Sequence, residues 1–425
     1  MPQHDRAAST VGREGAKGAA AGEMGSGKTG AGSNITFTNA SYGAPPPDAL
    51  FPDEKDTRAR PLAPAASVPA PTDTPWSGMP LRERMIRYPD ICLQILAHQI
   101  SSDYTRFFKR CVEPRLSGAT SGLNLRGHSL LLALGQMPDG QTGVELAFLI
   151  RTDPATVSRN IRALTRRGLV SSREHPSDAR ACIYTLTPDG RDAAALWLRE
   201  WDAAVAAAEA KLRMPLGEMQ FRSTLSAFYD LKDRARCWAL YTPGRAASFR
   251  RGIGRPAPGL RPSTGAVRDH ADSFFRFFGQ QVSSDYLLCL SRQLARPTIV
   301  GTEMSLTDLR ILIALDFCDE FMSGAELARS MRLDPATVTR GTALLCDSGL
   351  LRAEQSPADR RRNEFVPTEA GRAIAARYRA GADTLRTAVD ESFEEPWSRR
   401  KRAQTLDRIL TARDRARAFA EVRGI

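Results

Sequence analysis

The spacing of apolar and polar residues divides the chain into helices and short strands. Apolar runs at 130–134 and 312–315 predict the cores of two helices. Shortly after each run, the segments 142–145 and 323–326 have the S/T-x-x-E spacing of a helix-capping box. Each box predicts the start of a short helix, so the same local pattern occurs in two parts of the chain.

A second short helix is predicted after each capping box, across a tight turn. Asp153 and Asp334 can cap the N-terminus of this helix, and the proline after each suits its first position. In the first copy, Val157, Ile161 and Leu164 fall on one face, which gives the helix an apolar side for packing. Two short helices that meet at a tight turn predict a helix-turn-helix.

After each helix-turn-helix the pattern changes to that of a two-stranded hairpin. The strands are expected at 169–174 and 180–186 in the first copy, and at 350–355 and 361–366 in the second. A helix-turn-helix followed by a hairpin is a winged helix. Long helices rich in alanine and arginine are expected next, over about 190–240 and 371–422. The predicted fold class is mainly α with small β-hairpin wings: two winged helix-turn-helix modules plus long helices of the dimer-forming type.

The two winged helices are copies of one unit. The segment 152–159 recurs at 333–340, so that Asp153 corresponds to Asp334 at an offset of 181. Gly190-Arg191 recurs at the same offset as Gly371-Arg372, whereas 101–104 recurs at 283–286 with an offset of 182. Matches in this order indicate an internal repeat with one small insertion or deletion between its early helices.

Composition separates the repeats from two segments without helical or strand periodicity. Residues 1–80 are rich in Gly, Ala and Pro and are expected to form a disordered tail. Residues 242–267 combine Pro and Gly with several arginines and are expected to form a basic linker. The predicted modules occupy the remaining residues, 81–241 and 268–425.

Charge and cysteine usage restrict the class of protein. The formal net charge of +12 makes a polyanion a plausible partner, without choosing among DNA, RNA and a membrane surface. No apolar run approaches the roughly 20 residues of a spanning helix, and residues 1–21 lack the apolar core of a secretory signal, so no membrane association is expected. The seven cysteines are scattered, which argues against a zinc site or disulfide scaffold and favours the cytoplasm. Buried thiols are the common interpretation, and a redox-sensing thiol is the alternative.

One motif points to a different function. Residues 22–29 match the P-loop pattern G-x-x-x-x-G-K-[ST], but no strand precedes them and no helix follows to hold a phosphate. A Gly/Ser tail is therefore the preferred interpretation over an ATP site. The sequence shows no Ser/His/Asp or Cys/His set, so neither an enzyme activity nor a cofactor is expected.

The face of the second short helix opposite its apolar stripe carries the first candidate DNA-reading residues. These are Ser158, Arg159, Arg162 and Arg166. Arginine can pair with guanine or phosphate, and the major groove admits a helix. An arginine-rich helix face is more often simply solvated, but the capped turn before this helix and the hairpin after it favour the DNA-binding interpretation.

The tip of each predicted wing is also basic. Arg180 follows the first tip and corresponds to Arg361 in the second, where Arg360 adds a further cation. Cations on a protruding hairpin can reach a DNA backbone or minor groove. The alternative is a charged edge that discourages strand pairing.

Taken in order, these motifs resemble the MarR-type winged-helix regulators. The first copy carries the resemblance through 145–147, 153–159, 168–170, 176–180 and 190–191, and the second through 334–340, 349–350 and 357–361. Together they cover roughly 90–240 and 268–420. The resemblance implies a homodimer formed by N- and C-terminal helices, near-palindromic DNA operators, and release of DNA when a small molecule or oxidant acts. By position it also implies the following DNA-contacting residues: Thr156, Ser158, Arg159, Arg162 and Arg180, and Thr337, Thr339, Arg340 and Arg361.

This chain departs from that pattern in carrying two modules, which leads to the hypothesis of an intramolecular pseudo-dimer. The copies have also diverged: Arg162, Arg166 and Arg167 correspond to Ala343, Asp347 and Ser348. We therefore expect an asymmetric DNA site that the first module reads more strongly, or a second module that is mainly structural. The predicted function is a sequence-specific regulator that binds a double-stranded DNA operator, with a small-molecule effector as a further candidate partner. The alternatives are a winged-helix protein-interaction scaffold and, with little support, a P-loop nucleotidase.

Overall fold

The computed structural model describes residues 79–425, except 138, 241–267, 269, 294–297, 300–301, 358, 360 and 392–396. Residues 1–78 of the tail predicted over 1–80, which include the P-loop-like motif at 22–29, and the linker at 242–267 lie outside the described residues. The described residues are mainly helical and include two three-stranded antiparallel sheets, which confirms the predicted fold class.

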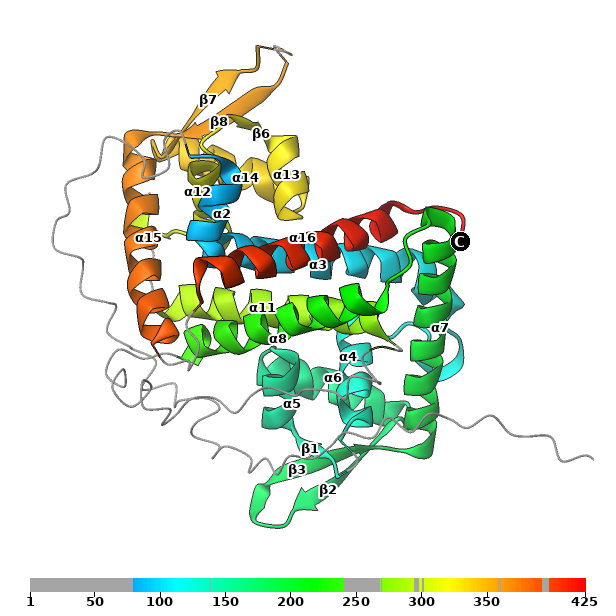
Figure 1. Cartoon of the computed structure of the whole chain (residues 1–425). Helices are drawn as coiled ribbons and strands as arrows, with labels where there is room; N and C mark the ends of the chain where they lie inside the picture. Colours follow the sequence, from blue (N-terminus) through cyan, green and yellow to red (C-terminus); the bar gives the residue numbers. More distant parts are fainter. Residues whose placement is uncertain are drawn as a thin grey trace, which may run out of the picture. The chain divides into compact units, whose positions relative to one another are not determined.

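The first repeat consists of helices and a small sheet that projects at one end of them (Figure 1). Its helices are α2 (Leu81–Arg87), α3 (Pro89–Phe107), α4 (Leu125–Gly135), α5 (Gly143–Ile150), α6 (Pro154–Arg166), α7 (Pro188–Leu212) and α8 (Glu218–Leu240). Its strands are β1 (Gln141–Thr142), β2 (Val170–His175) and β3 (Asp178–Leu186), in the order β1-β3-β2. The predicted long helical stretch is thus two helices, and α7 ends where Arg213 adopts a left-handed conformation with φ 54°.

The second repeat follows the same order. Its helices are α11 (Ala271–Gln293), α12 (Leu306–Cys318), α13 (Gly324–Met331), α14 (Pro335–Asp347), α15 (Glu369–Asp390) and α16 (Arg399–Glu421). Its sheet has the order β6-β8-β7, with β6 (Met322–Ser323), β7 (Leu351–Gln355) and β8 (Asn363–Pro367). A small extra hairpin, β4 (Thr298–Ile299) and β5 (Thr302–Glu303), precedes α12 and lies outside this sheet.

The predicted helix starts are confirmed in both repeats. The Thr142 hydroxyl accepts a hydrogen bond from the Glu145 N–H at 3.2 Å, and the Glu145 carboxylate accepts one from the Thr142 N–H at 2.7 Å. Ser323 and Glu326 form the same capping box. Asp153 and Asp334 cap α6 and α14, each with proline at the start of the helix. Local sequence alone therefore sets where both helices of each helix-turn-helix begin.

A glycine fixes how each long helix begins against its wing. A Cβ atom at Gly190 would lie 1.9 Å from the carbonyl oxygen of Leu169, and one at Gly371 would lie 2.2 Å from that of Leu350. No side chain fits at that distance, so the close approach of α7 and α15 to the start of the wing requires glycine. This contact explains why Gly190 and Gly371 recur at the repeat offset.

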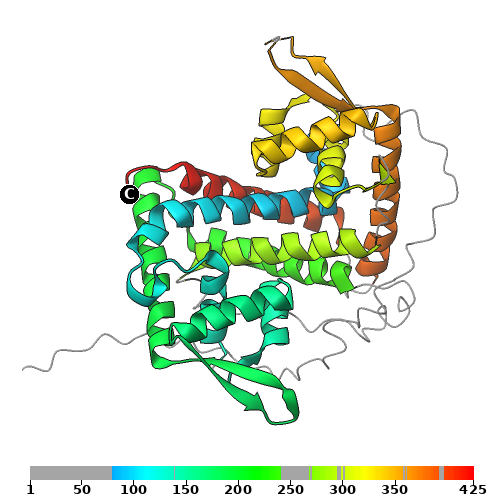
Figure 2. The same ribbon diagram turned by 180° about the vertical axis from the view of Figure 1, so that it is seen from behind.

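Helices from both repeats pack against each other. Helices α3 and α8 of the first repeat lie beside α11 and α16 of the second (Figures 1 and 2). The first repeat also contributes Tyr88, Ile91 and Cys92 to the apolar core formed by residues of the second winged helix. Burial of this apolar surface stabilises the two repeats jointly rather than one at a time. Among the described helices, none is both long and apolar enough to cross a membrane.

Candidate nucleic-acid interface

Helix α6 presents the expected division between a buried and an exposed face. Val157, Ile161 and Leu164 are buried, whereas the candidate reading residues of this helix, Ser158, Arg159, Arg162 and Arg166, are exposed. Its N-terminus is held by Asp153, which accepts a hydrogen bond from the Thr156 N–H at 2.7 Å. Hydrogen bonds from the Thr156 hydroxyl and N–H lower the pKa of Asp153, so this cap is a carboxylate at neutral pH.

Two of the exposed arginines are ordered along the helix by short polar neighbours. The Arg159 guanidinium donates to the Thr156 hydroxyl at 2.9 Å, and Arg162 donates to the Ser158 hydroxyl and carbonyl, each at 3.3 Å. These bonds hold the guanidinium groups over the exposed face, where a groove-bound base or phosphate can exchange with the hydroxyl partners. Thr156, which the resemblance implied as a contact, is half-buried and serves here as a partner of Arg159.

Arg167 has a different role from its neighbour Arg166. Its guanidinium donates to the carbonyl oxygens of Ala119 and Ser121, at 2.9 and 2.7 Å. It therefore holds the segment before α4 against the end of α6. Only part of the basic cluster at this end of the helix is available to a ligand.

Helix α14 keeps the shape of α6 but not its charge. Arg340 donates to the Thr337 hydroxyl at 3.5 Å, as Arg159 does to Thr156, and the Thr339 hydroxyl donates back to the Pro335 carbonyl at 2.9 Å. The exposed positions that correspond to Arg162 and Arg166 are Ala343 and Asp347. The outer face of α14 thus carries one arginine and one carboxylate where α6 carries three arginines.

The wing cations occupy equivalent places in the two repeats. The Arg180 N–H donates to the Asp178 carboxylate at 2.9 Å, and the Arg361 N–H donates to the Asp359 carboxylate at 3.0 Å. Both arginine side chains are exposed, and both wings project as hairpins from the helices (Figure 2). Arg360, the additional cation expected on the second wing, lies outside the described residues.

Each reading module is tied to a helix of the other repeat by a buried ion pair. Arg151, at the end of α5, donates to the Asp285 carboxylate of α11 at 2.9 Å. Arg332, at the end of α13, donates through Nε and Nη2 to the two carboxylate oxygens of Asp103 in α3, each at 2.7 Å. The side chains of both pairs are at most 6% exposed. The pairs are reciprocal, because the offsets of the repeat convert one into the other.

The arginines of these pairs stand at the turn between the two helices of each helix-turn-helix. Arg151 and Arg332 adopt the left-handed conformation, with φ 52° and 51°, which glycine adopts more readily. Two residues later the N-cap of α6 or α14 begins, so each ion pair fixes the turn that orients the reading helix. These residues were not predicted from the sequence, although Asp103 recurs as Asp285 at an offset of 182 and Arg151 recurs as Arg332 at an offset of 181.

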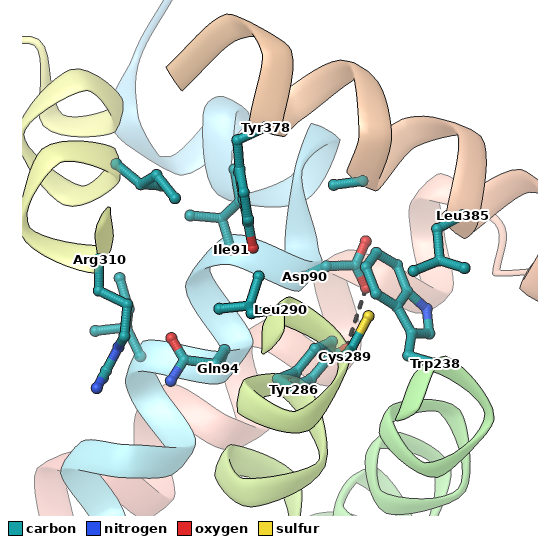
Figure 3. A pocket seen from close by; sticks show the side chains of 13 residues that line it. Asp90, Ile91, Gln94, Trp238, Tyr286, Cys289, Leu290, Arg310, Tyr378 and Leu385 are labelled. Atoms are coloured by element: carbon teal, nitrogen blue, oxygen red, sulfur yellow. Dashed lines mark hydrogen bonds between the residues drawn. The ribbon is translucent and has the colours of Figure 1, made fainter. Parts of the chain in front are cut away.

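A small cavity of about 20 Å³ lies where the second module meets the helices shared by both repeats (Figure 3). Arg310 and Gln94 lie toward one side of it, and Asp90 and Trp238 toward the other. The Tyr286 hydroxyl donates to the Asp90 carboxylate at 3.1 Å, and burial raises the pKa of Asp90 to about 6. On the other side, the Arg310 Nε and Nη2 and the Gln94 Nε2 are buried donors with no hydrogen-bond acceptor.

The cysteines and the possible metal ligands among the described residues were compared with the interface. Cys182 on β3 is exposed, Cys318 and Cys346 are half-buried, and the other cysteines are buried. Within the part of the chain that the structure describes, no group of three or more His, Cys, Asp and Glu side chains could hold a metal ion.

Comparison with known proteins gives a family for both modules. The MarR family model matches the chain twice, over residues 121–181 and 302–362. Each match contains a helix-turn-helix and residues of its wing, so the chain carries two MarR-family domains in tandem. No curated protein matches the chain. MarR-family winged helices indicate a DNA-binding transcriptional regulator.

Proposed function

We propose that this chain, with its two MarR-family domains, binds a specific double-stranded DNA operator as a single-chain pseudo-dimer. The observation that carries the proposal is the exposed face of α6, where Arg159, Arg162 and Arg166 stand on a helix whose opposite side is buried. Such a face can enter the major groove, where arginine pairs with guanine. Arg180 on the wing supplies a backbone or minor-groove contact.

The pseudo-dimer proposal rests on the packing of helices from both repeats and on the reciprocal ion pairs. Helices α3 and α11 pack side by side, as N-terminal helices of two subunits would in a dimer. The modules proposed along the sequence, 81–241 and 268–425, then correspond to the two subunits, joined by residues 242–267. Sedimentation of the full chain at the mass of one chain supports this arrangement, and an obligate two-chain particle contradicts it.

The difference between α6 and α14 supports an asymmetric operator. We expect the first module to select bases through its arginine face and the second to contribute mainly backbone contacts through Arg340 and its wing. Equal protection of two identical half-sites in a footprint would contradict this expectation, because protein asymmetry predicts an asymmetric site.

Salt-titrated DNA binding tests the proposal. Binding of the full chain to genomic fragments, including the region upstream of its own coding sequence, is measured by fluorescence anisotropy. The double variant Arg159→Ala/Arg162→Ala is expected to lose at least about thirty-fold in affinity for the selected fragment, since a base contact is worth roughly 1–3 kcal/mol. The matched control is Arg222→Ala, which removes an exposed ion pair with Glu218 on α8.

The two interpretations of the chain give opposite results in this assay. A regulator binds one fragment tightly, with a steep dependence on salt that becomes shallower in the double variant. Weak binding to all fragments, equal in the double variant and the control, would mean that the basic charge is generic and that the chain is a protein-interaction scaffold.

The cavity beside the second module is the proposed site of a small-molecule effector. Its unpaired donors, on Arg310 and Gln94, suit a ligand with a carboxylate or similar acceptor group, and its apolar walls suit a flat ligand body. At about 20 Å³ the cavity has room for about one water molecule. Any larger ligand must therefore separate α12 and α15 from the shared helices, which couples binding to the position of the second module.

A further inference from the structure

The same site can be located in the first module, because matching bonds establish which residues correspond. Beside the second winged helix Tyr286 donates to Asp90, and beside the first winged helix Tyr104, at the repeat offset of 182, donates to Asp272. On the other helices, the N-caps Thr187 and Thr368 occupy equivalent positions at the offset of 181. The residues that line the two sites can therefore be compared one by one.

At three positions on α11 and α15 that line the cavity of the second module, the first module carries a larger, aromatic side chain. Ala382 corresponds to Trp201, Cys289 to Phe107 and Leu290 to Phe108, by the offsets of 181 and 182. In the second module these smaller residues leave the cavity open between α11 and α15. The largest difference is at Ala382, the smallest of these three residues, because the first module has tryptophan at the corresponding position.

Trp201 occupies the position that Ala382 has in the second module. It is fully buried, and its ring centroid lies 5.9 Å from that of Phe107, 6.0 Å from Phe108, 6.3 Å from Tyr104 and 5.7 Å from Trp197. The Phe108 ring is stacked on it with an interplanar angle of 21°. A side chain packed among four rings excludes a ligand from that position.

The first site nevertheless keeps the polar groups of a binding site. Arg276, at the position of Gln94, is fully buried and donates to Ser129, at the position of Arg310, at 3.1 Å. Its Nε and Nη1 have no acceptor, as is true of the donors of Arg310 in the second module. Both sites thus contain a buried guanidinium, and a cavity lined by Arg310 lies in the site of the second module.

We infer that ligand control of this chain is one-sided: an anionic, flat small molecule binds beside Arg310, while Trp201 permanently occupies the equivalent site beside Arg276. The inference rests on the proposed function, since the cavity is the proposed effector site. One ligand then binds per chain. It displaces only the second module, and the first module, with the arginine-rich reading helix, keeps its position.

Exchange of the small and large residues tests this inference, with benzoate as the probe. Equilibrium dialysis of labelled benzoate against the full chain is expected to give one site per chain. Trp201→Ala opens the space beside Arg276 and raises the count to two, because an apolar cavity left by truncation can accept an aromatic ligand. Ala382→Leu fills the second site and lowers benzoate affinity at least tenfold. Circular dichroism establishes that each variant is folded.

Each outcome decides the inference. Two sites in the unmodified chain, a single site in folded Trp201→Ala, unchanged binding in Ala382→Leu, or no benzoate binding at all would overturn it. If Trp201→Ala fails to fold, loss of the single site in Ala382→Leu supports the inference and its retention overturns it. DNA binding is measured on the same samples without benzoate, so that failure of the proposed function appears as loss of DNA binding in the unmodified chain.

Discussion

The buried pair of Arg332 and Asp103 gives the sharpest test of how the second module is held. Substitution of Arg332 by Met keeps an unbranched side chain out to about the position of Nε and removes the charged guanidinium. The Asp103 carboxylate, 1% exposed, then loses both guanidinium hydrogen bonds at 2.7 Å. Removal of one partner of a buried pair leaves an uncompensated charge, which costs about 3–5 kcal/mol.

The expected magnitude depends on burial, so an exposed pair of similar geometry is the control. Arg82 donates to both carboxylate oxygens of Asp407 at 2.9 and 3.0 Å, but the two side chains are 62% and 54% exposed. Substitution of Arg82 by Met is expected to cost no more than about 1 kcal/mol, because solvent screens such pairs. The two variants therefore remove a similar two-bond contact in opposite environments.

Urea unfolding followed by circular dichroism measures both variants. Arg332→Met is expected to lower the midpoint clearly, and the double variant Asp103→Leu/Arg332→Met is expected to recover most of the loss, since no buried charge remains. Equal midpoints for Arg332→Met and Arg82→Met would refute the reasoning. So would a double variant that is less stable than Arg332→Met, because the cost would then not come from an unpaired carboxylate.

Three further predictions concern the wing, the cavity and the glycine contact. Gly190→Ala is expected to lower the free energy of unfolding by at least about 1–3 kcal/mol, because its Cβ would overlap the Leu169 carbonyl, whereas Gly217→Ala, with open space around its Cβ, serves as the control in thermal unfolding. The folded-state pKa of Asp90 is raised from 3.8 to about 6, so the stability that this residue contributes is fully present below pH 3.8 and is lost as the pH rises through 6. Its size is at most roughly 3 kcal/mol, and Asp90→Asn should remove this part of the pH dependence in urea titrations. The exposed Cys182 on β3 should react with a thiol reagent faster than half-buried Cys346, and bound operator DNA should slow Cys182 alone; no slowing at saturating DNA would place the wing away from the DNA.

Local patterns were sufficient to predict most of the fold. The capping boxes, the N-caps and the apolar stripe of α6 involve residues within about one helical turn, so the sequence displays them directly. Strands β1 and β6, with two residues each, were missed because so short a segment has no readable period. The break between α7 and α8 was also not predicted, although Pro215 and Gly217 directly after Arg213 are typical signals of a helix end.

The parts of the site that depend on both repeats could not be predicted in this way. Arg332 and Asp103 are 229 positions apart, and their pairing appears only when helices of one repeat pack on the module of the other. The sequence likewise does not show that Trp201 and Ala382 occupy equivalent sites, because Ala382 is seen to line a cavity only in the structure. The repeat offset did contain a signal for these ion pairs, because it aligns Arg151 with Arg332. A charged residue that is kept in both copies, although the copies have diverged elsewhere, indicates a buried partner.

The crossed pairing of the repeats also has a consequence for how the chain folds during synthesis. Asp285 emerges 134 residues after Arg151, which at about 5–20 residues per second is a delay of roughly 7–27 s. The partners of α3 are completed later still. Arg110, which lies just after α3, donates to the Val422 carbonyl, and Val422 is 312 positions further along the chain. A nascent first repeat therefore lacks the partner of Arg151 while 134 residues are synthesised, and lacks part of the cover of α3 for longer. The ribosome-bound chain should depend on chaperones until the second repeat arrives to complete the first.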